Sequence, residues 1–273
     1  MDRKDVDRRA LIAGIGGAVA GSLIAGNAVA GQLNPPSGSV GPTGRRNSSI
    51  ANMIARTAQG IAEPRIPVES LAGAADALYV IDQSGSYYLT QNLAGAGGKH
   101  GIRIAASHVD LHLGGFHLNG LGDGTGIAPL SAIVSDAQNV TVYDGSLNGW
   151  TRGIDFQHAS QFIVWDVTCI GAAVAGIVLG DRGQAYDADV YSCPGDGFLA
   201  LGVRTLVEQC GAWTCGTGFH AVSAQNLFLG NCATECAAPF SLAQGNTFGP
   251  IVVVAGDLGA QPASNHHEAN YVF

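Results

Sequence analysis

Short runs of alternating apolar and polar residues, separated by glycines, follow one another along the chain from Leu78 to Val254. Gly101-Ile102-Arg103-Ile104 and Val109-Asp110-Leu111-His112-Leu113 are two such runs. Successive side chains of a β-strand point to opposite faces, so this alternation predicts short strands that each bury one face. Apolar residues at helical spacing do not occur between these runs, and crossover helices are therefore not expected.

A repeat of about 21 residues runs through the stretch from Ala132 to Phe240. Its markers are Gly153, Gly176, Gly197, Gly218 and Pro239, at steps of 23, 21, 21 and 21 residues. Each marker precedes an apolar residue: Ile154, Ile177, Phe198, Phe219 or Phe240. A fixed short period in a glycine-rich chain is typical of a solenoid. We interpret the markers as turns, because glycine is favoured where the backbone reverses.

These patterns predict an all-β fold, a right-handed single-stranded parallel β-helix of about eight coils. The handedness follows from the general preference for right-handed crossovers between parallel strands. We divide the chain into residues 1–30, a signal peptide; 31–62, a linker and capping helix; and 63–273, the β-helix domain. A helix from Ile50 to Ile61 would close the N-terminal end, and a C-terminal cap would dock through Tyr271 and Phe273. Residues 121–129 are expected to form a loop off the cylinder.

The first 30 residues have the pattern of an export signal. Arg8-Arg9 precede a mildly apolar run, and Ala28-Val29-Ala30 forms a small-residue cleavage site. This order predicts a twin-arginine signal and a periplasmic or extracellular location, with an N-terminal membrane anchor as the alternative. We expect no membrane span in the mature chain.

The net charge of the chain limits the classes of partner that it could bind. The chain has a formal net charge of −8, and only 12% of its residues are charged. Without a basic stripe, binding to nucleic acid or to anionic lipid is not expected. A glycan is a possible partner, on the ground of the aromatic residues described below.

Several segments together resemble a family of exported bacterial right-handed parallel β-helix repeat proteins with a pectate-lyase-like superfamily fold. The segments are Leu33-Asn34-Pro35-Pro36, Glu63-Pro64-Arg65-Ile66-Pro67-Val68, Gly85 to Thr90, Gly98 to Ala106, Val109 to Phe116, Asn139 to Gly145 and Ala269 to Phe273. The resemblance implies the fold and the export. It implies no reaction, because members of this family are mostly uncharacterised and the superfamily hosts several functions.

Three aspartates are the candidate catalytic residues. Aligned on the repeat, Asp144, Asp166 and Asp189 share one position, which Gln209 and Asn231 then continue. Stacked carboxylates could act as acid and base in a polysaccharide lyase or hydrolase, where Ca²⁺ would be the possible cofactor. The alternative is a column of turn residues, since Asp, Asn and Gln bond to backbone groups in turns. Neither metal nor cofactor is otherwise predicted, although His112, His117 and the His266-His267-Glu268 cluster were considered as ligands.

Aromatic residues near strand ends are the candidate substrate-binding residues. Tyr143, Trp165 and Tyr186 would suit sugar rings on an exposed sheet, or they would plug the ends of coils. The cysteines Cys210, Cys215, Cys232 and Cys236 are disulfide candidates in an exported protein. Buried thiols that pack as small apolar groups are the alternative.

The sequence thus leaves three hypotheses for function. The first is an exported, non-catalytic β-helix that binds extracellular polysaccharide or a cell-surface polymer. The second is a lyase or hydrolase of acidic glycans, and the third is a structural envelope or adhesion module. Whether the protein is an enzyme stays open at this point.

Overall fold

The computed structural model describes residues 65–120, 130–254 and 268–273. The chain divides into two compact units, Met1–Ile61 and Ala62–Phe273, and only the second contains described residues. The predicted signal peptide, the Ile50 to Ile61 helix, the 121–129 loop and the His266-His267 pair lie outside them. The described part is all-β, with parallel sheets that form a solenoid of about eight turns, as predicted. None of its helices has the length and apolarity needed to cross a membrane.

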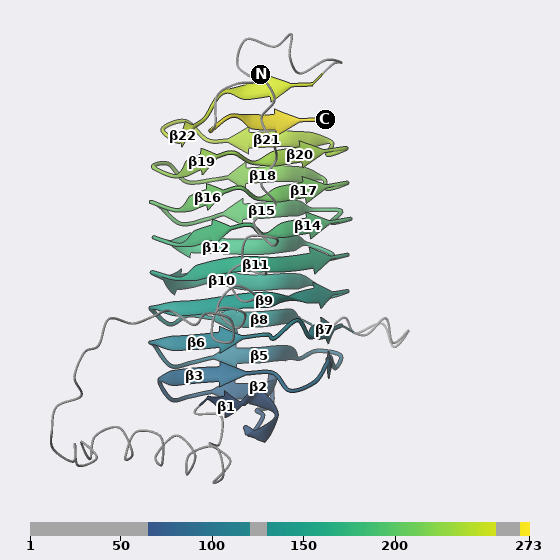
Figure 1. Ribbon diagram of the computed structural model, residues 1–273, viewed down its shortest axis with the longest axis vertical. Coiled ribbons are helices and arrows are strands. Elements are labelled where there is room, and N and C mark those ends of the chain that lie inside the picture. The colour runs from purple at the N-terminus through teal and green to yellow at the C-terminus, as the bar shows by residue number, and fades with distance from the viewer. Residues whose placement is uncertain (1–64, 121–129, 255–267) are drawn as a thin grey trace, which may run out of the picture. The chain divides into compact units, whose positions relative to one another are not determined.

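One face of the solenoid is an eight-stranded sheet to which every coil contributes its first strand (Figure 1). Its strands, in spatial order, are β2 (Ala77–Ile81), β5 (His100–Ile104), β8 (Ser131–Ser135), β10 (Arg152–Ser160), β12 (Ala175–Asp181), β15 (Asp196–Ala200), β18 (Thr217–Ala221) and β21 (Ala238–Leu242). All neighbours are parallel, so the chain must pass once around the solenoid between each strand and the next.

The remaining strands form a sixteen-stranded sheet that covers two faces. Its first half contains β1 (Ile66–Pro67), β3 (Gly85–Tyr88), β6 (Val109–His112), the start of β9 (Val140–Asn148), the start of β11 (Ile163–Ile170), β13 (Gln184–Tyr186), β16 (Leu206–Glu208), β19 (Leu227–Leu229) and β22 (Thr247–Phe248). Its second half contains β4 (Leu93–Ala94), β7 (His117–Asn119), the ends of β9 and β11, β14 (Asp189–Tyr191), β17 (Gly211–Trp213), β20 (Cys232–Thr234), β23 (Ile251–Val253) and β24 (Asn270–Val272). A single 3₁₀ turn, η1 (Val68–Ser70), follows β1.

The corners between the three faces are columns of residues with positive φ. The corner that follows the eight-stranded sheet contains His108, Asn139, Gln161, Arg182, Arg204, Gln225 and Gly245. The corner within the sixteen-stranded sheet contains Asp144, Asp166, Asp187, Gln209 and Gly230, and the third contains Gly149, Gly171, Ser192, Thr214 and Glu235. A left-handed residue turns the chain sharply, and glycine and short polar side chains reach this conformation most readily. The polar residues between the strands are therefore explained by the turning of the backbone.

The marker glycines are strand residues, and their interpretation as turns was wrong. Gly153, Gly176, Gly197 and Gly218 lie in β10, β12, β15 and β18, and none has a positive φ. A Cβ on Gly176 would lie 2.5 Å from Cγ1 of Val190 and 2.7 Å from the carbonyl oxygen of Gly197. Glycine is required there because the next coil and the opposite wall leave no room for a side chain.

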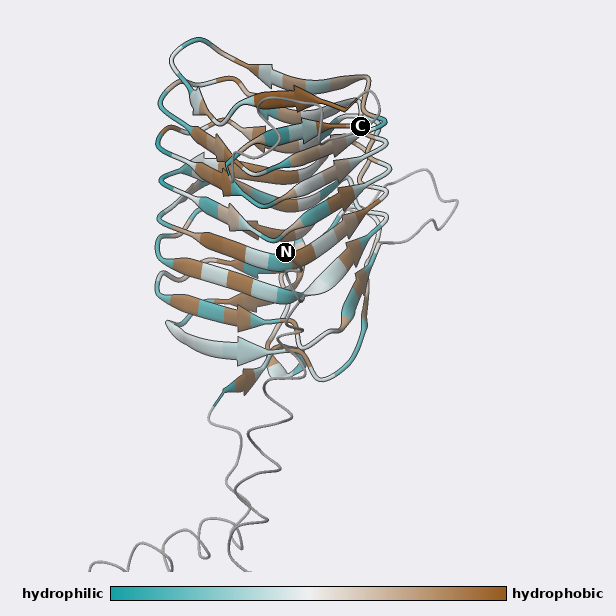
Figure 2. Cartoon of the chain, turned by 45° about the horizontal axis from the view of Figure 1, so that its top comes forward, coloured by the Kyte–Doolittle hydropathy of each residue, from teal (hydrophilic) through white to brown (hydrophobic). Residues whose placement is uncertain are grey.

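The apolar residues after the markers form the ladder that fills the core. Ile154 pairs with Ile177, Ile177 with Phe198 and Phe198 with Phe219, and the rings of Phe198, Phe219 and Phe240 stack at 5.0 and 5.1 Å. Apolar and polar segments alternate along these strands in Figure 2. Burial of such side chains is the main stabilising term, worth about 1.5–3 kcal/mol for each large apolar residue.

The C-terminal cap is a strand that inserts into the sheet. Strand β24 pairs with β20 on one side and β23 on the other, all parallel. Asn270 is fully buried, and its Oδ1 accepts hydrogen bonds from the main-chain N–H and Nδ2 of Asn231, each at 3.0 Å. Docking thus depends on Ala269 and Asn270 rather than on Phe273, whose side chain is exposed.

Candidate functional site

The catalytic candidates Asp144, Asp166 and Asp189 do not share one column. Trp165 pairs with Tyr186 and Thr168 with Asp189, so the residue beside Asp166 is Asp187. Asp144, Asp166 and Asp187 have φ values of 61°, 52° and 45°, which are the corner conformation. The alignment on the markers misplaced Asp189 by two residues, because the chain from Gly153 to Asp166 is two residues longer than the chain from Gly176 to Asp187, and the register of β10 with β12 shifts between Phe156 and Ser160.

The side chains of Asp144 and Asp189 have structural partners of their own. Asp144 Oδ2 lies 2.7 Å from Nε2 of His112, whose Nδ1 accepts a 2.6 Å hydrogen bond from Arg65. Burial raises the pKa of Asp189, a hydrogen bond to Tyr191 opposes this, and the charges of Asp166 and Asp187 raise it further. No group of three or more His, Cys, Asp or Glu side chains within residues 65–120, 130–254 and 268–273 could hold a metal ion.

The substrate-binding candidates Tyr143, Trp165 and Tyr186 do lie in one column, on the outer face of the first half of the sixteen-stranded sheet. The rings of His112 and Tyr143 stack at 4.6 Å and 14°, and those of Tyr143 and Trp165 at 5.1 Å and 6°. The ring faces therefore cover one another along the solenoid axis. A sugar ring stacks on an aromatic face, so this column leaves mainly ring edges for a ligand.

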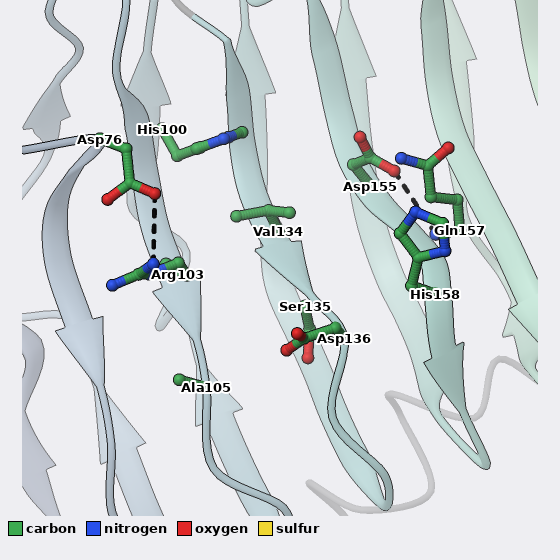
Figure 3. A pocket seen from close by; sticks show the side chains of 10 residues that line it. All are labelled: Asp76, His100, Arg103, Ala105, Val134, Ser135, Asp136, Asp155, Gln157 and His158. Carbon is green, nitrogen blue, oxygen red and sulfur yellow. Dashed lines mark hydrogen bonds and ion pairs between the residues drawn. The ribbon is translucent and has the colours of Figure 1, made fainter.

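A cleft on the outer face of the eight-stranded sheet brings together several charged and hydrogen-bonding side chains. It has a volume of about 270 Å³ and crosses β5, β8 and β10 (Figure 3). Its walls are formed by Asp76, His100, Arg103, Ala105, Val134, Ser135, Asp136, Asp155, Gln157 and His158. Val134 lies between Arg103 and Asp155 in the sheet register, so it forms the floor between the two charged groups.

Two ion pairs order the charged groups of the cleft. Arg103 NH1 lies 3.2 Å from Oδ2 of Asp76 on the β5 side. Arg152 NH1 lies 3.1 Å from Oδ2 of Asp155, whose Oδ1 accepts a longer bond from the main-chain N–H of Gln157 at 3.4 Å. The Asp155 carboxylate is almost fully buried, so the arginine and the hydrogen bonds are what keep its charge tolerable there.

His100 presents a hydrogen-bond donor at the upper end of the cleft. The main-chain N–H of Ser131 donates to its Nδ1 at 3.2 Å, so a neutral ring carries its proton on Nε2. Burial is the largest influence on His100 and lowers its pKa, against the opposing charges of Asp76 and Asp155. The ring is therefore neutral at pH 7, and the cleft offers donors and carboxylate acceptors within a few ångströms of one another.

Sequence reasoning did not single out this cleft. Its residues come from four coils, those of β2, β5, β8 and β10, which are separated by long and unequal steps, with residues 121–129 between two of them. The one available signal was the occurrence of charged residues in or directly after consecutive strands, namely Arg103 in β5, Asp136 after β8 and Asp155 in β10. That signal becomes visible only when the register of β5, β8 and β10 is known.

The six cysteines are free thiols in the structure. Cys215 and Cys236 follow the corner residues Thr214 and Glu235 in adjacent coils, and their side chains share a hydrogen bond. Cys210 and Cys232 occupy different columns, because Cys232 pairs with Gly211. Of the four disulfide candidates, only Cys215 and Cys236 are brought together.

We compared the chain with protein-family models, curated proteins and solved structures. No family model, no curated protein and no solved structure matches it.

Proposed function

We propose that this chain is an exported solenoid that binds polysaccharide through the cleft over β5, β8 and β10. The export rests on the twin-arginine pattern of residues 1–30, and the likeness to exported bacterial β-helix repeat proteins of pectate-lyase-like fold rests on the segments quoted above. The observation that carries the binding proposal is the cleft itself. It is the place where hydrogen-bond donors and carboxylates from successive coils, among them the buried Asp155, converge on one concave surface.

The chemistry of the cleft suits a sugar unit. Carboxylates such as Asp155 accept hydrogen bonds from hydroxyl groups, and the neutral His100 and the Gln157 amide can donate to ring or hydroxyl oxygens. A volume of about 270 Å³ is slightly below the usual range for small-molecule sites, so one sugar unit rather than a long segment would sit in it. The polymer on either side would run over the outer face of the sheet.

An acidic glycan fits this surface poorly. The chain carries a net charge of −8, and the cleft has three aspartates against one arginine among its lining residues. Charge repulsion would oppose a polyuronate, which weakens the hypothesis of a lyase for acidic glycans. The hypothesis of a purely structural module predicts that the cleft is empty of any glycan under all conditions.

Filling the cleft tests the proposal. A glycan array first identifies a ligand. Calorimetry then compares the affinities of Val134→Trp and the control Leu199→Trp. Leu199, in β15, lies in the same column of the sheet as Val134 but outside the cleft. We expect Val134→Trp to weaken binding at least tenfold, about 1.4 kcal/mol, and Leu199→Trp to leave it unchanged. Absence of any glycan hit, or equal affinity of the two variants, would refute the proposal.

A further inference from the structure

We propose that the sugar unit held in this cleft carries a protonated amine, so that the preferred ligand is an amino-sugar polymer. The inference rests on the proposed function and names the class of glycan. Its evidence is the balance of charge in the cleft.

The arginines next to the cleft are already engaged. Arg103 pairs with Asp76, and Arg152 pairs with Asp155. Asp136 is the third lining carboxylate, and none of the described residues forms an ion pair or a hydrogen bond with it. Asp76, Asp136 and Asp155 bring three negative charges against the two positive charges of Arg103 and Arg152, which leaves one negative charge among these groups.

Asp136 is placed to receive a cation from solvent. It follows β8 at the edge of the cleft, next to Ser135, and its side chain is exposed. An ammonium group provides three hydrogen-bond donors and one positive charge, so a single group could both bond to Asp136 and offset the excess negative charge. A hydroxyl group in the same position would supply the hydrogen bond alone, and a carboxylate would add a second negative charge.

The opposite wall offers groups for the rest of the sugar ring. Arg103 Nε is buried and bonds to no described atom, although NH1 of the same side chain holds Asp76. An unbonded buried donor is costly, and a ligand oxygen that reached Nε after a rotation of the guanidinium group would relieve that cost. His100 Nε2 provides a second donor on the same side. Thus the donors lie towards β5, and the uncompensated carboxylate lies at the end of β8.

Three oligosaccharides of equal length distinguish the classes of ligand: four units of glucosamine, of glucose or of galacturonate. We expect calorimetry at pH 7 to give at least tenfold tighter binding of the glucosamine tetramer than of the glucose tetramer, and no binding of the galacturonate tetramer. Asp136→Asn should reduce that preference below threefold. Asp196→Asn, which removes an equal charge from β15 outside the cleft, should preserve it.

The other outcomes separate a failure of the amino-sugar inference from a failure of the proposed function. If the glucose tetramer binds as tightly as the glucosamine tetramer, or if Asp136→Asn keeps the preference, the amino-sugar inference is wrong and the proposed function stands. If glucosamine binds equally well to Val134→Trp, the ligand lies elsewhere on this acidic protein, and both proposals fail. Circular dichroism of each variant confirms that the solenoid is intact.

Discussion

Asp166 and Asp187 lie beside each other on adjacent coils, and both adopt the left-handed backbone conformation, with φ of 52° and 45°. Their main chain continues the ladder around the corner, since the N–H of Asp187 donates to the carbonyl of Glu208 at 3.3 Å. The column to which they belong ends in Gln209 and Gly230, which have the same conformation. The requirement at this position is therefore conformational.

The effect of a substitution at Asp187 on stability should depend on how readily the new residue adopts a positive φ. Asp187→Gly is expected to leave the free energy of unfolding nearly unchanged, whereas Asp187→Val should lower it by about 1–2 kcal/mol, because a β-branched residue is strained at positive φ. Asp189→Val is the matched control, since Asp189 is a strand residue of β14. Guanidinium unfolding measures all three. Equal effects of Asp187→Val and Asp189→Val would contradict the assignment of the corner.

Substitution of an inward-facing strand glycine should lower stability more than substitution of a corner glycine. Gly176→Ala should destabilise the protein by about 3 kcal/mol, because its Cβ would meet Val190 and the backbone of Gly197. Gly171→Ala should cost about 1 kcal/mol, since φ is 65° there but nothing lies within 4 Å of the added Cβ. Thermal unfolding of the two variants tests the order, and a larger loss for Gly171→Ala would restore the interpretation of the markers as turns.

The fold could be predicted from the sequence because period-2 alternation and a 21-residue repeat leave few architectures. Tyr143, Trp165 and Tyr186 were expected near strand ends on an exposed sheet, and the structure adds that they share one column. The register between coils could not be read, because corners and strands both tolerate glycine and aspartate. Asp189 was misplaced for that reason. The cleft depends on that register across coils of unequal length, so His100 and Asp155 were not recognised as neighbours across β8.

The C-terminal strand should depend on one buried side chain. Asn270→Ala removes a side chain that bonds to Asn231 and to the carbonyls of Phe228 and Gly249. Loss of partners for several buried polar groups is expected to cost about 2–4 kcal/mol locally. Hydrogen exchange should then show faster exchange of residues 270–272, while Tyr271→Ala should have a smaller effect. Unchanged protection in Asn270→Ala would mean that other contacts hold the strand.

The thiols should differ sharply in reactivity. The Cys215 thiol donates to the sulfur of Cys236, and this hydrogen bond lowers the pKa of Cys236, so Cys236 ionises more readily than a free thiol. Alkylation followed by mass spectrometry should label Cys236 first, with a rate that rises at a lower pH than the rate for an ordinary thiol. Cys215→Ser should shift that rise to higher pH, and Cys232→Ser should not. A rise only near pH 8.5 in the native protein would contradict the pairing.

Histidine side chains give the most direct test of the central claim, which is that a glycan binds in the cleft over β5, β8 and β10. Nitrogen-15 spectra of the imidazole rings, recorded during titration with the glycan found on the array, report on each face of the solenoid separately. The account predicts that signals of His100 and His158 shift with ligand, that His100 stays neutral with its proton on Nε2, and that signals of His112 and His220 do not move. Shifts confined to His112, beside the aromatic column, would contradict it.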